Sequence, residues 1–394
     1  MSGPTEITFD IVVSGCATQC WHCYVCGRPA PAMALRDVER VLAFVDAFSR
    51  IAEDQGVLVH PYLDLEPMLH PDIVTILSLS QAVDAFSMPT CIPTTGIPIA
   101  RRDDWRRVLA AYRQAGVRQL EFTLHGPEAI HDEAVSREGA FQSHNQAVRR
   151  AKESGFEARL NLMVSKPMLR HVQETMDAVD RNAYDHRRAA IPTYAPNARL
   201  RGFERLRPEL PDVMPHRALL RACCDDQDGD GNRWKTVAGS TEGRAYQNLL
   251  ASEGACRSYQ SLIESLPTWY FVTVGPDRDV RYGNGLHRTD GLGRVGESPP
   301  AEVLQRVLER YPNYALGGYF PIDSLPAPIE VARAVADPRG GRIYHTTEEI
   351  HVMWLDQYLF GTRPDPDCLD SAPVSPLEGT TMAGPINPAS GDSP

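Results

Sequence analysis

The sequence contains no apolar segment that approaches the roughly 20 residues needed to span a lipid bilayer. It also lacks an excess of positive charge, because the formal net charge is −11. That sign disfavours nucleic acid and anionic membranes as partners. The first residues, Met1–Glu6, are few and polar, so we expect no signal peptide. These features predict a protein that acts without a membrane or nucleic-acid partner.

An even set of cysteines for disulfide bonds is also missing. The chain has nine cysteines, and four of them are crowded into residues 16–26. An odd, clustered set favours metal ligation in a reducing cytoplasm over a disulfide framework. Apolar residues make up 42% and charged residues 23% of the chain, as in ordinary globular proteins. Its length allows one domain of about 200–250 residues and a smaller one.

The crowded cysteines follow a predicted strand. Residues 7–13 are β-branched and apolar, and a Ser-Gly pair ends the run. Cys16, Cys20 and Cys23 then lie on one loop, with gaps that let three thiolates converge on one face of an iron–sulfur cluster. A fourth iron without a protein ligand suits a cluster that binds and reduces something, since electron-transfer clusters normally take four cysteines. Zinc, the alternative, normally needs two ligand pairs, and only one such pair is present here.

Strand and helix patterns alternate after this loop. Helical apolar spacing over residues 35–51 is followed by a strand pattern over 57–67, and the same order recurs through residue 194. Six such repeats over about 190 residues are too few for an eight-fold barrel. We therefore predict an α/β fold, a partial (β/α)6 barrel with a smaller α+β C-terminal extension. Such sheets bind ligands at the C-terminal ends of their strands, where we expect the cysteines.

The cysteine loop resembles the cluster loop of radical S-adenosylmethionine (radical SAM) enzymes. In that family three cysteines hold a [4Fe-4S] cluster, and the open iron chelates the amino and carboxylate groups of SAM. The resemblance implies that Cys16, Cys20 and Cys23 are the metal ligands. It also implies reductive cleavage of SAM to a 5′-deoxyadenosyl radical, which removes hydrogen from a substrate carbon. His22 stands where the family usually has an aromatic residue, and Tyr24 follows the third cysteine.

Further motifs resemble the same family in the same order. Glu66-Pro67 is similar to the end of its Gly-Gly-Glu-Pro motif, with Asp64 and Leu65 in place of the glycines. Thr94-Thr95-Gly96 is similar to its Thr-Asn-Gly, and Thr123 stands in the hydroxyl position of its Ser-Leu-Asp-Gly. A basic residue and an asparagine of the fifth strand often contact SAM in the family. The resemblance implies these SAM-binding residues: His22, Tyr24, Glu66, Thr94, Thr123, Arg159 and Asn161.

The C-terminal part resembles the SPASM or shorter twitch extension of many radical SAM enzymes. Cys256 matches its first cluster ligand, and residues 269–282 form a predicted hairpin. No cysteine follows in residues 283–287, so we expect a degenerate extension without its cluster. The competing prediction is an auxiliary cluster. It would use Cys223, Cys224, Cys256 and Cys368, and it is disfavoured because adjacent cysteines are awkward ligands of one cluster.

These patterns divide the chain into three predicted parts. Residues 1–200 are the radical SAM partial-barrel domain, 201–365 the SPASM/twitch-like extension and 366–394 a disordered tail without apolar periodicity. Residues 226–232 resemble the first half of a calcium loop, but Val237 occupies the position of the bidentate glutamate. A solvated acidic loop is therefore the preferred interpretation.

We expect an enzyme that uses the radical on a small polar metabolite, such as a sugar, aminosugar or nucleoside of a biosynthetic pathway. No leader-peptide or cobalamin domain is expected before the first strand, and the reductant would be a flavodoxin or ferredoxin. Cys91, Cys223 and Cys224 are candidates for a hydrogen-atom donor. Two alternatives stay open. One is a maturase that forms a cross-link or thioether in a ribosomal peptide, and the other is a non-catalytic iron–sulfur scaffold.

Overall fold

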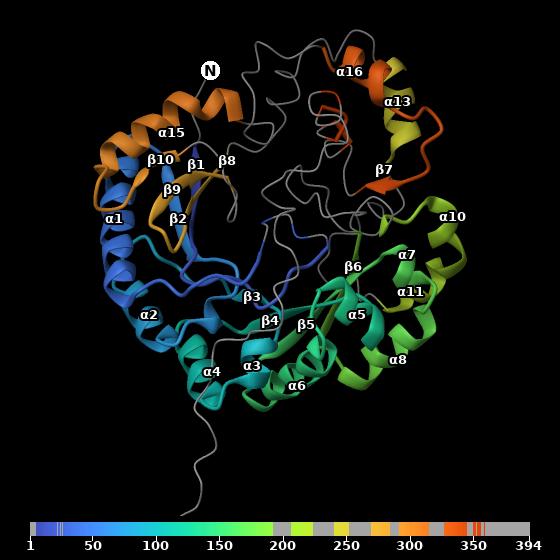
Figure 1. The fold of residues 1–394 in the computed structure, drawn as a ribbon, viewed down its shortest axis with the longest axis horizontal. Coiled ribbons are helices and arrows are strands. Elements are labelled where there is room, and N and C mark those ends of the chain that lie inside the picture. The colour runs from blue at the N-terminus through green and yellow to red at the C-terminus, as the bar shows by residue number, and fades with distance from the viewer. Residues whose placement is uncertain are drawn as a thin grey trace, which may run out of the picture.

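The computed structural model describes most of the chain up to residue 358 (Figure 1). The described residues are 5–21, 23, 25, 27–191, 206–223, 240–251, 269–283, 291–314, 327–344, 350–351, 353–355 and 358. The predicted tail of residues 366–394 lies outside them.

Strands and helices alternate through the first half of the chain. The strands are β1 (Glu6–Ile11), β2 (Leu58–Leu63), β3 (Cys91–Thr94), β4 (Gln119–Leu124), β5 (Glu157–Met163) and β6 (His186–Ala190). The helices between and after them are α1 (Leu35–Glu53), α2 (Ile73–Ser80), α3 (Ile97–Arg101), α4 (Trp105–Gln114), α5 (Glu128–Ala134), α6 (Ala140–Glu153), α7 (Lys166–Leu169) and α8 (Val172–Asn182), with the 3-10 turn η1 (Pro67–Leu69). The predicted α/β fold is confirmed, and the short helices α3, α5 and α7 are additional to the predicted ones.

The strands of the barrel form two sheets. β3, β4, β5 and β6 are parallel neighbours in one sheet, and β1 and β2 are parallel neighbours in the other. The second sheet continues past β1 with a hairpin from the C-terminal half: β8 (Trp269–Val274), β9 (Asp279–Tyr282) and β10 (Gly291–Arg294). β8 runs parallel to β1, and its Thr273 lies opposite Asp10. The hairpin predicted for the extension therefore widens the barrel sheet itself.

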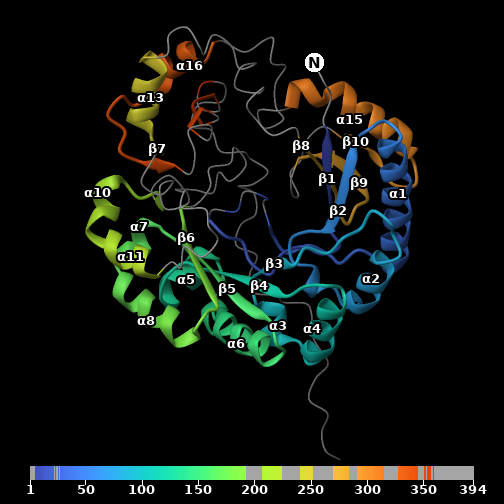
Figure 2. The ribbon, with the colours of Figure 1, turned by 180° about the vertical axis from the view of Figure 1, so that it is seen from behind.

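Strands β1 and β4 each have an apolar outer face and a more polar inner face. On β1, Phe9 is fully buried, and its ring lies 5.2 Å from that of Phe48 of α1. On β4, Leu120 and Phe122 are likewise buried. Because side chains alternate along a strand, the residues between them, such as Glu121, point away from the helices. Figures 1 and 2 show the helices on the outside of the strands.

The C-terminal helices pack in two places. α15 (Pro300–Tyr314) lies against α1 (Figure 1), whereas α13 (Glu242–Ala251) and α16 (Pro328–Val335) share a second apolar core with Trp354. In that core the Glu242 carboxylate accepts a hydrogen bond from the indole Nε1 of Trp354 at 3.0 Å. The remaining elements are α10 (Leu210–Val213), η2 (Met214–His216), α11 (Arg217–Cys223), β7 (Ser240–Thr241) and β11 (Ile343–Tyr344).

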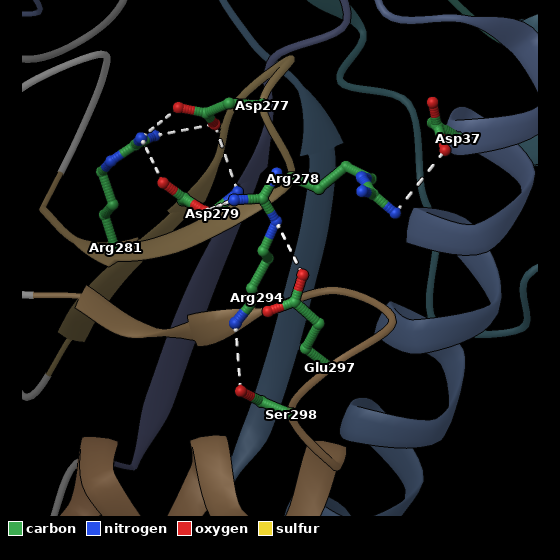
Figure 3. A network of polar contacts seen from close by, with 8 residues as sticks. All are labelled: Asp37, Asp277, Arg278, Asp279, Arg281, Arg294, Glu297 and Ser298. Carbon is green, nitrogen blue, oxygen red and sulfur yellow. Dashed lines mark hydrogen bonds and ion pairs between the residues drawn. The ribbon is translucent and has the colours of Figure 1, made fainter.

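A network of ion pairs fixes the β8–β9 turn to its surroundings. The Arg294 guanidinium lies 3.3 Å from both Asp279 and Glu297, and Arg278 reaches Asp37 of α1 at 3.8 Å. Exposed ion pairs each contribute at most about 1 kcal/mol, so the network orients the turn more than it stabilises the fold. Figure 3 shows its eight residues: Asp37, Asp277, Arg278, Asp279, Arg281, Arg294, Glu297 and Ser298.

Among the helices in the described part of the chain, none is both long and apolar enough to cross a bilayer.

The contact between β1 and α1 gives a stability prediction. Phe9→Ala removes a fully buried ring that packs against Phe44 and Phe48, so the free energy of unfolding should fall by about 3–5 kcal/mol in urea titrations. Leu58→Ala, at a position that is 54% exposed, is the matched control and should change it by less than about 0.5 kcal/mol. Equal effects of the two substitutions would contradict this packing of Phe9 against α1.

Candidate functional site

The three predicted cluster cysteines lie together on the loop after β1. The hydroxyl oxygen of Thr18 is 3.3 Å from Cys16 Sγ and 3.4 Å from Cys20 Sγ. The backbone N–H of Gly27 donates to Cys23 Sγ at 3.0 Å. A Cβ atom added to Gly27 would lie 3.2 Å from the Cys16 Cβ and 3.3 Å from Cys23 Sγ. The loop therefore encloses a small space lined by sulfur, and a side chain at Gly27 would fill part of it.

The backbone of this loop is bound to the end of α5. The N–H of Gln19 donates to the carbonyl of Val135 at 3.1 Å, and the N–H of Trp21 donates to that of Ala134 at 3.0 Å. Carbonyls at the end of a helix have no partner inside the helix, so an external donor completes them. The cysteine loop supplies those donors. These hydrogen bonds fix the position of the loop relative to α5.

A second support of the loop comes from the segment between α5 and α6. The Arg137 guanidinium donates to the carbonyl of Ala17 at 2.6 Å. That segment is fixed in turn by Asp132, whose carboxylate accepts from the backbone N–H groups of Gly139 and Phe141, both at 2.7 Å. A carboxylate at the start of α6 also suits the positive end of the helix dipole.

The donor set fits an iron–sulfur cluster. Burial and the nearby Glu66 carboxylate raise the pKa of the Cys16 thiol to about 12, and burial with the charges of Cys23 and Cys16 raises the pKa of Cys20. Thiols in such a place become thiolates only when a strongly positive group binds them. Among the described residues, no three His, Cys, Asp or Glu side chains are arranged to hold a single metal ion. A cluster differs from a single ion because each thiolate takes its own iron.

Glu66 joins the ends of β2 and β3. Its carboxylate accepts a hydrogen bond from the Thr94 hydroxyl at 2.9 Å and from the Thr95 backbone N–H at 2.6 Å. Burial raises its pKa, while these hydrogen bonds oppose the shift. The Ser14 hydroxyl, just before the cysteines, donates to the Glu66 carbonyl at 2.9 Å. The structure thus brings two of the predicted SAM-binding residues, Glu66 and Thr94, together beside the cysteine loop.

The backbone before Glu66 keeps a conformation that favours glycine. Leu65 has a φ of 62°, in the left-handed region, although the side chain is branched at Cγ. That conformation costs roughly 1–2 kcal/mol for an L-residue. The family motif that this stretch resembles has glycine here, the residue that adopts this conformation most readily.

Three further predicted residues share the inner face of the β3–β6 sheet. Thr123 of β4 lies directly opposite Asn161 of β5. Arg159 sits two residues earlier, and its guanidinium donates to the Gln119 side chain at 3.1 Å, toward the start of the strands. The structure therefore groups Thr123 with Asn161 and directs Arg159 away from the cysteine end.

An arginine that no sequence motif marks occupies this face on β6. Arg188 lies opposite Asn161, donates to its side-chain oxygen at 3.2 Å and pairs with Glu121 at 2.7 Å. The apolar pattern predicts a strand only from residue 189 onward, because the charged stretch before it lacks an apolar run. A strand whose inner face is charged gives no such run, so only the β5–β6 register reveals Arg188.

Several predicted residues lie outside the described part. These are His22, Tyr24, Cys224, Cys256, Cys368, the acidic loop 226–232 and residues 284–287. Cys223 ends α11, but its side chain is not among the described ones. Cys91 begins β3 and so lies at the opposite end of the strands from the cysteine loop. The auxiliary cluster and the choice of a hydrogen-atom donor stay predictions.

Three buried histidines lie close together: His125 after β4, His131 on α5 and His144 on α6. The His131 ring is 5.6 Å from that of His125 and 5.5 Å from that of His144, whose Nε2 hydrogen-bonds to the Tyr184 hydroxyl. Burial lowers the pKa of His131 to about 4, and it also lowers the pKa of His144. His131 and His144 are therefore neutral near pH 7, and their rings form part of the packing between α5 and α6.

Comparison with known proteins gives one family and one fold. The family model described as Radical SAM superfamily matches residues 11–179. Native anSMEcpe with bound AdoMet and the Cp18Cys peptide is 12% identical, with a TM-score of 0.51 over 92% of this chain and 98% of that chain. Its structure with the Kp18Cys peptide is 14% identical, with the same TM-score and the same coverage of both chains.

A third similar structure is SuiB of Streptococcus suis bound to the precursor peptide SuiA. It is 15% identical, with a TM-score of 0.45 over 88% of this chain and 76% of that chain. No curated protein matches the chain. At identities this low, the likeness to anSMEcpe shows a shared fold.

The strained turn before Glu66 gives a stability prediction. Leu65→Gly should have a free energy of unfolding about 1 kcal/mol higher than Leu65→Ala, because both remove the side chain and only glycine relieves the left-handed backbone. Urea titration of the two variants measures the difference. An alanine variant as stable as the glycine variant would mean that the turn carries no strain.

The buried histidines give a pH prediction. An unfolded histidine binds a proton below about pH 6.5, whereas folded His131 binds one only below about pH 4, so the free energy of unfolding should fall as pH drops through that window. The loss from this side chain is of the order of 3 kcal/mol. His131→Phe should remove it, whereas His171→Phe, at an exposed histidine, should keep the wild-type slope. Parallel pH profiles of wild type and His131→Phe would contradict the assignment.

Proposed function

We propose that this chain, whose residues 11–179 match the radical SAM superfamily model, cleaves SAM reductively at a [4Fe-4S] cluster. The 5′-deoxyadenosyl radical that the cluster and SAM supply would remove hydrogen from a small polar metabolite, such as a sugar, aminosugar or nucleoside of a biosynthetic pathway. The observation that carries this proposal is the sulfur-lined loop of Cys16, Cys20 and Cys23 at the C-terminal end of β1.

The protein's own residues would hold the cluster as follows. Cys16, Cys20 and Cys23 supply three thiolates, and the Gly27 N–H donates to the third sulfur. Hydrogen bonds to cluster sulfurs tune the reduction potential. Arg137 fixes the loop through Ala17 and lies close enough to Cys16 for their charges to interact. A guanidinium near the cluster favours its reduced, more negative state.

We propose that SAM binds to residues at or near the ends of β2, β4 and β5. Glu66 has remaining lone pairs for an ammonium group after its bonds to Thr94 and Thr95. Thr123 and Asn161 offer a hydroxyl and an amide on the inner face of β4 and β5. His22 and Tyr24 remain proposed contacts from the cysteine loop, and Arg159 remains a proposed contact to the carboxylate.

A polar substrate is supported by the inner face of β4–β6. Glu121, Arg188 and Asn161 form a connected set there, and the Arg188 side chain is 38% exposed. The hydrogen bonds of Arg188 to Asn161 and Glu121 use its Nε and one terminal nitrogen, so the other terminal nitrogen can donate to a substrate oxygen. An apolar substrate would offer no acceptor to that remaining nitrogen of Arg188, which is costly in a site that excludes water.

We further propose the setting in which the enzyme works. A flavodoxin or ferredoxin would supply the electron, and the clustered, odd set of cysteines supports a cytoplasmic location. Residues 1–200 would form the partial-barrel domain and 201–365 a SPASM/twitch-like extension, whose hairpin β8–β9 pairs with β1. We propose no auxiliary cluster.

Peptide maturation is the second candidate function. It is supported by the anSMEcpe structures, which hold the Cp18Cys and Kp18Cys peptides and whose fold covers 92% of this chain. A peptide substrate would be extended and would leave part of its length outside the barrel. Tight binding of a short synthetic peptide, with hydrogen exchange between that peptide and SAM, would favour this candidate over a small metabolite.

The proposal predicts SAM cleavage that depends on the cysteine loop. After anaerobic reconstitution and reduction, wild type should hold about four irons per chain and release 5′-deoxyadenosine slowly, as measured by mass spectrometry. The triple variant Cys16→Ala/Cys20→Ala/Cys23→Ala should lose both. Cys91→Ala is the matched control, since Cys91 lies at the far end of the strands, and it should keep both.

Two other outcomes are informative. About four irons remaining in the triple variant would establish an auxiliary cluster. Iron in wild type without SAM binding or cleavage would contradict the catalytic proposal and favour the scaffold.

A further inference from the structure

Two carboxyl groups meet on the inner side of the β1–β2 pair. Asp10 of β1 is fully buried, and it lies opposite Tyr62 of β2 and Thr273 of β8. Its neighbours Phe9 and Ile11 belong to the outer core, so the Asp10 side chain points inward. Asp64 directly follows β2, and its backbone N–H still pairs with the carbonyl of Ile11 at 3.0 Å.

Each of these carboxyl groups keeps one buried oxygen without a partner. The Thr273 hydroxyl donates to Asp10 Oδ2 at 3.4 Å, and the Tyr62 side chain also hydrogen-bonds to Asp10. The Leu65 backbone hydrogen-bonds to Asp64. Asp10 Oδ1 and Asp64 Oδ2 have no hydrogen-bond partner among the described residues. Burial and the Asp64 charge raise the pKa of Asp10, and burial raises that of Asp64 to about 6. Buried carboxylate oxygens without hydrogen bonds are costly, so two of them on neighbouring strands point to a ligand.

The chemistry of the Asp10–Asp64 pair favours an ammonium group over a metal ion. A multivalent metal ion normally needs further ligands, and no group of three such side chains is present in the described part of the chain. An ammonium group carries one positive charge and three N–H donors, which can satisfy both oxygens at once. Charge-assisted hydrogen bonds of this kind are about twice as strong as neutral ones.

We propose that Asp10 and Asp64 bind the ammonium group of the substrate. The inference rests on the proposed function and narrows its substrate class to amines, such as an aminosugar. Both carboxyl groups lie where β1 and β2 end, and the cysteine loop leaves the same end of β1. An amine held there would place its neighbouring carbon atoms beside the proposed cluster site.

Glu121 provides a contrast within the same barrel. It is also an inner-face carboxylate, but Arg188 pairs with it at 2.7 Å. Its charge is compensated by the protein itself, and it needs no ligand. Glu121→Gln is therefore the matched control for Asp10→Asn and Asp64→Asn.

The first test compares melting temperatures of the full chain without any amine present. Asp10→Asn and Asp64→Asn should each raise the melting temperature by at least about 2 °C, because the amide relieves like-charge repulsion and can donate to the remaining carboxylate. Glu121→Gln should lower it, because Arg188 loses its charged partner. A drop in the aspartate variants equal to that of Glu121→Gln would overturn the proposal and make the pair structural.

The second test uses methylammonium chloride as the probe, with sodium chloride at equal ionic strength as reference. Methylammonium should raise the melting temperature of wild type and of Glu121→Gln above the sodium reference. Its apparent affinity for Asp10→Asn/Asp64→Asn should be at least about tenfold weaker. No stabilisation of wild type by methylammonium, or equal stabilisation of the double variant, would overturn the proposal.

SAM also carries an ammonium group, so the wild-type measurement is repeated with saturating SAM. Further stabilisation by methylammonium would show that Asp10 and Asp64 remain available to a substrate amine. Loss of this stabilisation would show that the two carboxyl groups bind SAM instead, and it would overturn the proposal. The assay does not depend on turnover. Ammonium binding without deoxyadenosine formation would count against the proposed function alone, and the reverse result would count against this inference alone.

Discussion

The hydrogen bonds between the cysteine loop and the end of α5 are the contacts on which the rest of the site depends. A loop that follows a strand has no backbone pairing with neighbouring strands to define its path. Thiolates must nevertheless be placed to within a fraction of an ångström to ligate a cluster. Here the loop completes the last carbonyls of a helix, and Arg137 holds its first turn through Ala17. Asp132 in turn fixes the start of α6. Contacts with two helices of the barrel, α5 and α6, therefore determine the position of the loop.

Buried acids are concentrated at the same end of the strands. Glu66 has its hydrogen bonds supplied by Thr94 and Thr95, whereas Asp10 and Asp64 keep oxygens without partners. All three have a pKa raised by burial. A protein that only needed stability would place apolar residues here. Their presence supports the proposal that this end of the barrel receives positive charge, from SAM and from a substrate amine.

The sequence was informative where residue spacing has a direct geometric meaning. Apolar periodicity predicted the long helices, such as α1. The gaps between Cys16, Cys20 and Cys23 predicted that their thiols converge. The hairpin β8–β9 was predicted as well, but not its pairing with β1, because strand order is decided by contacts between residues more than 250 apart in the chain.

The inner faces of the strands were harder to predict. Arg188 was missed because its strand lacks an apolar run, and Asp10 was missed because a lone acid in an apolar strand has no spacing to mark it. α5 was missed since it is short and carries three acids and a histidine in seven residues. Leu65 shows the opposite case, in which the sequence lacks the glycine of the motif but the backbone still adopts a conformation that favours glycine.

Electron paramagnetic resonance of the reduced, reconstituted protein tests the central claim most directly. If three cysteines of one loop hold the cluster and leave one iron open, addition of SAM should shift the g-values of the reduced cluster. A cluster signal that SAM leaves unchanged would mean that the fourth iron is not available, and it would contradict SAM binding at the cysteine loop.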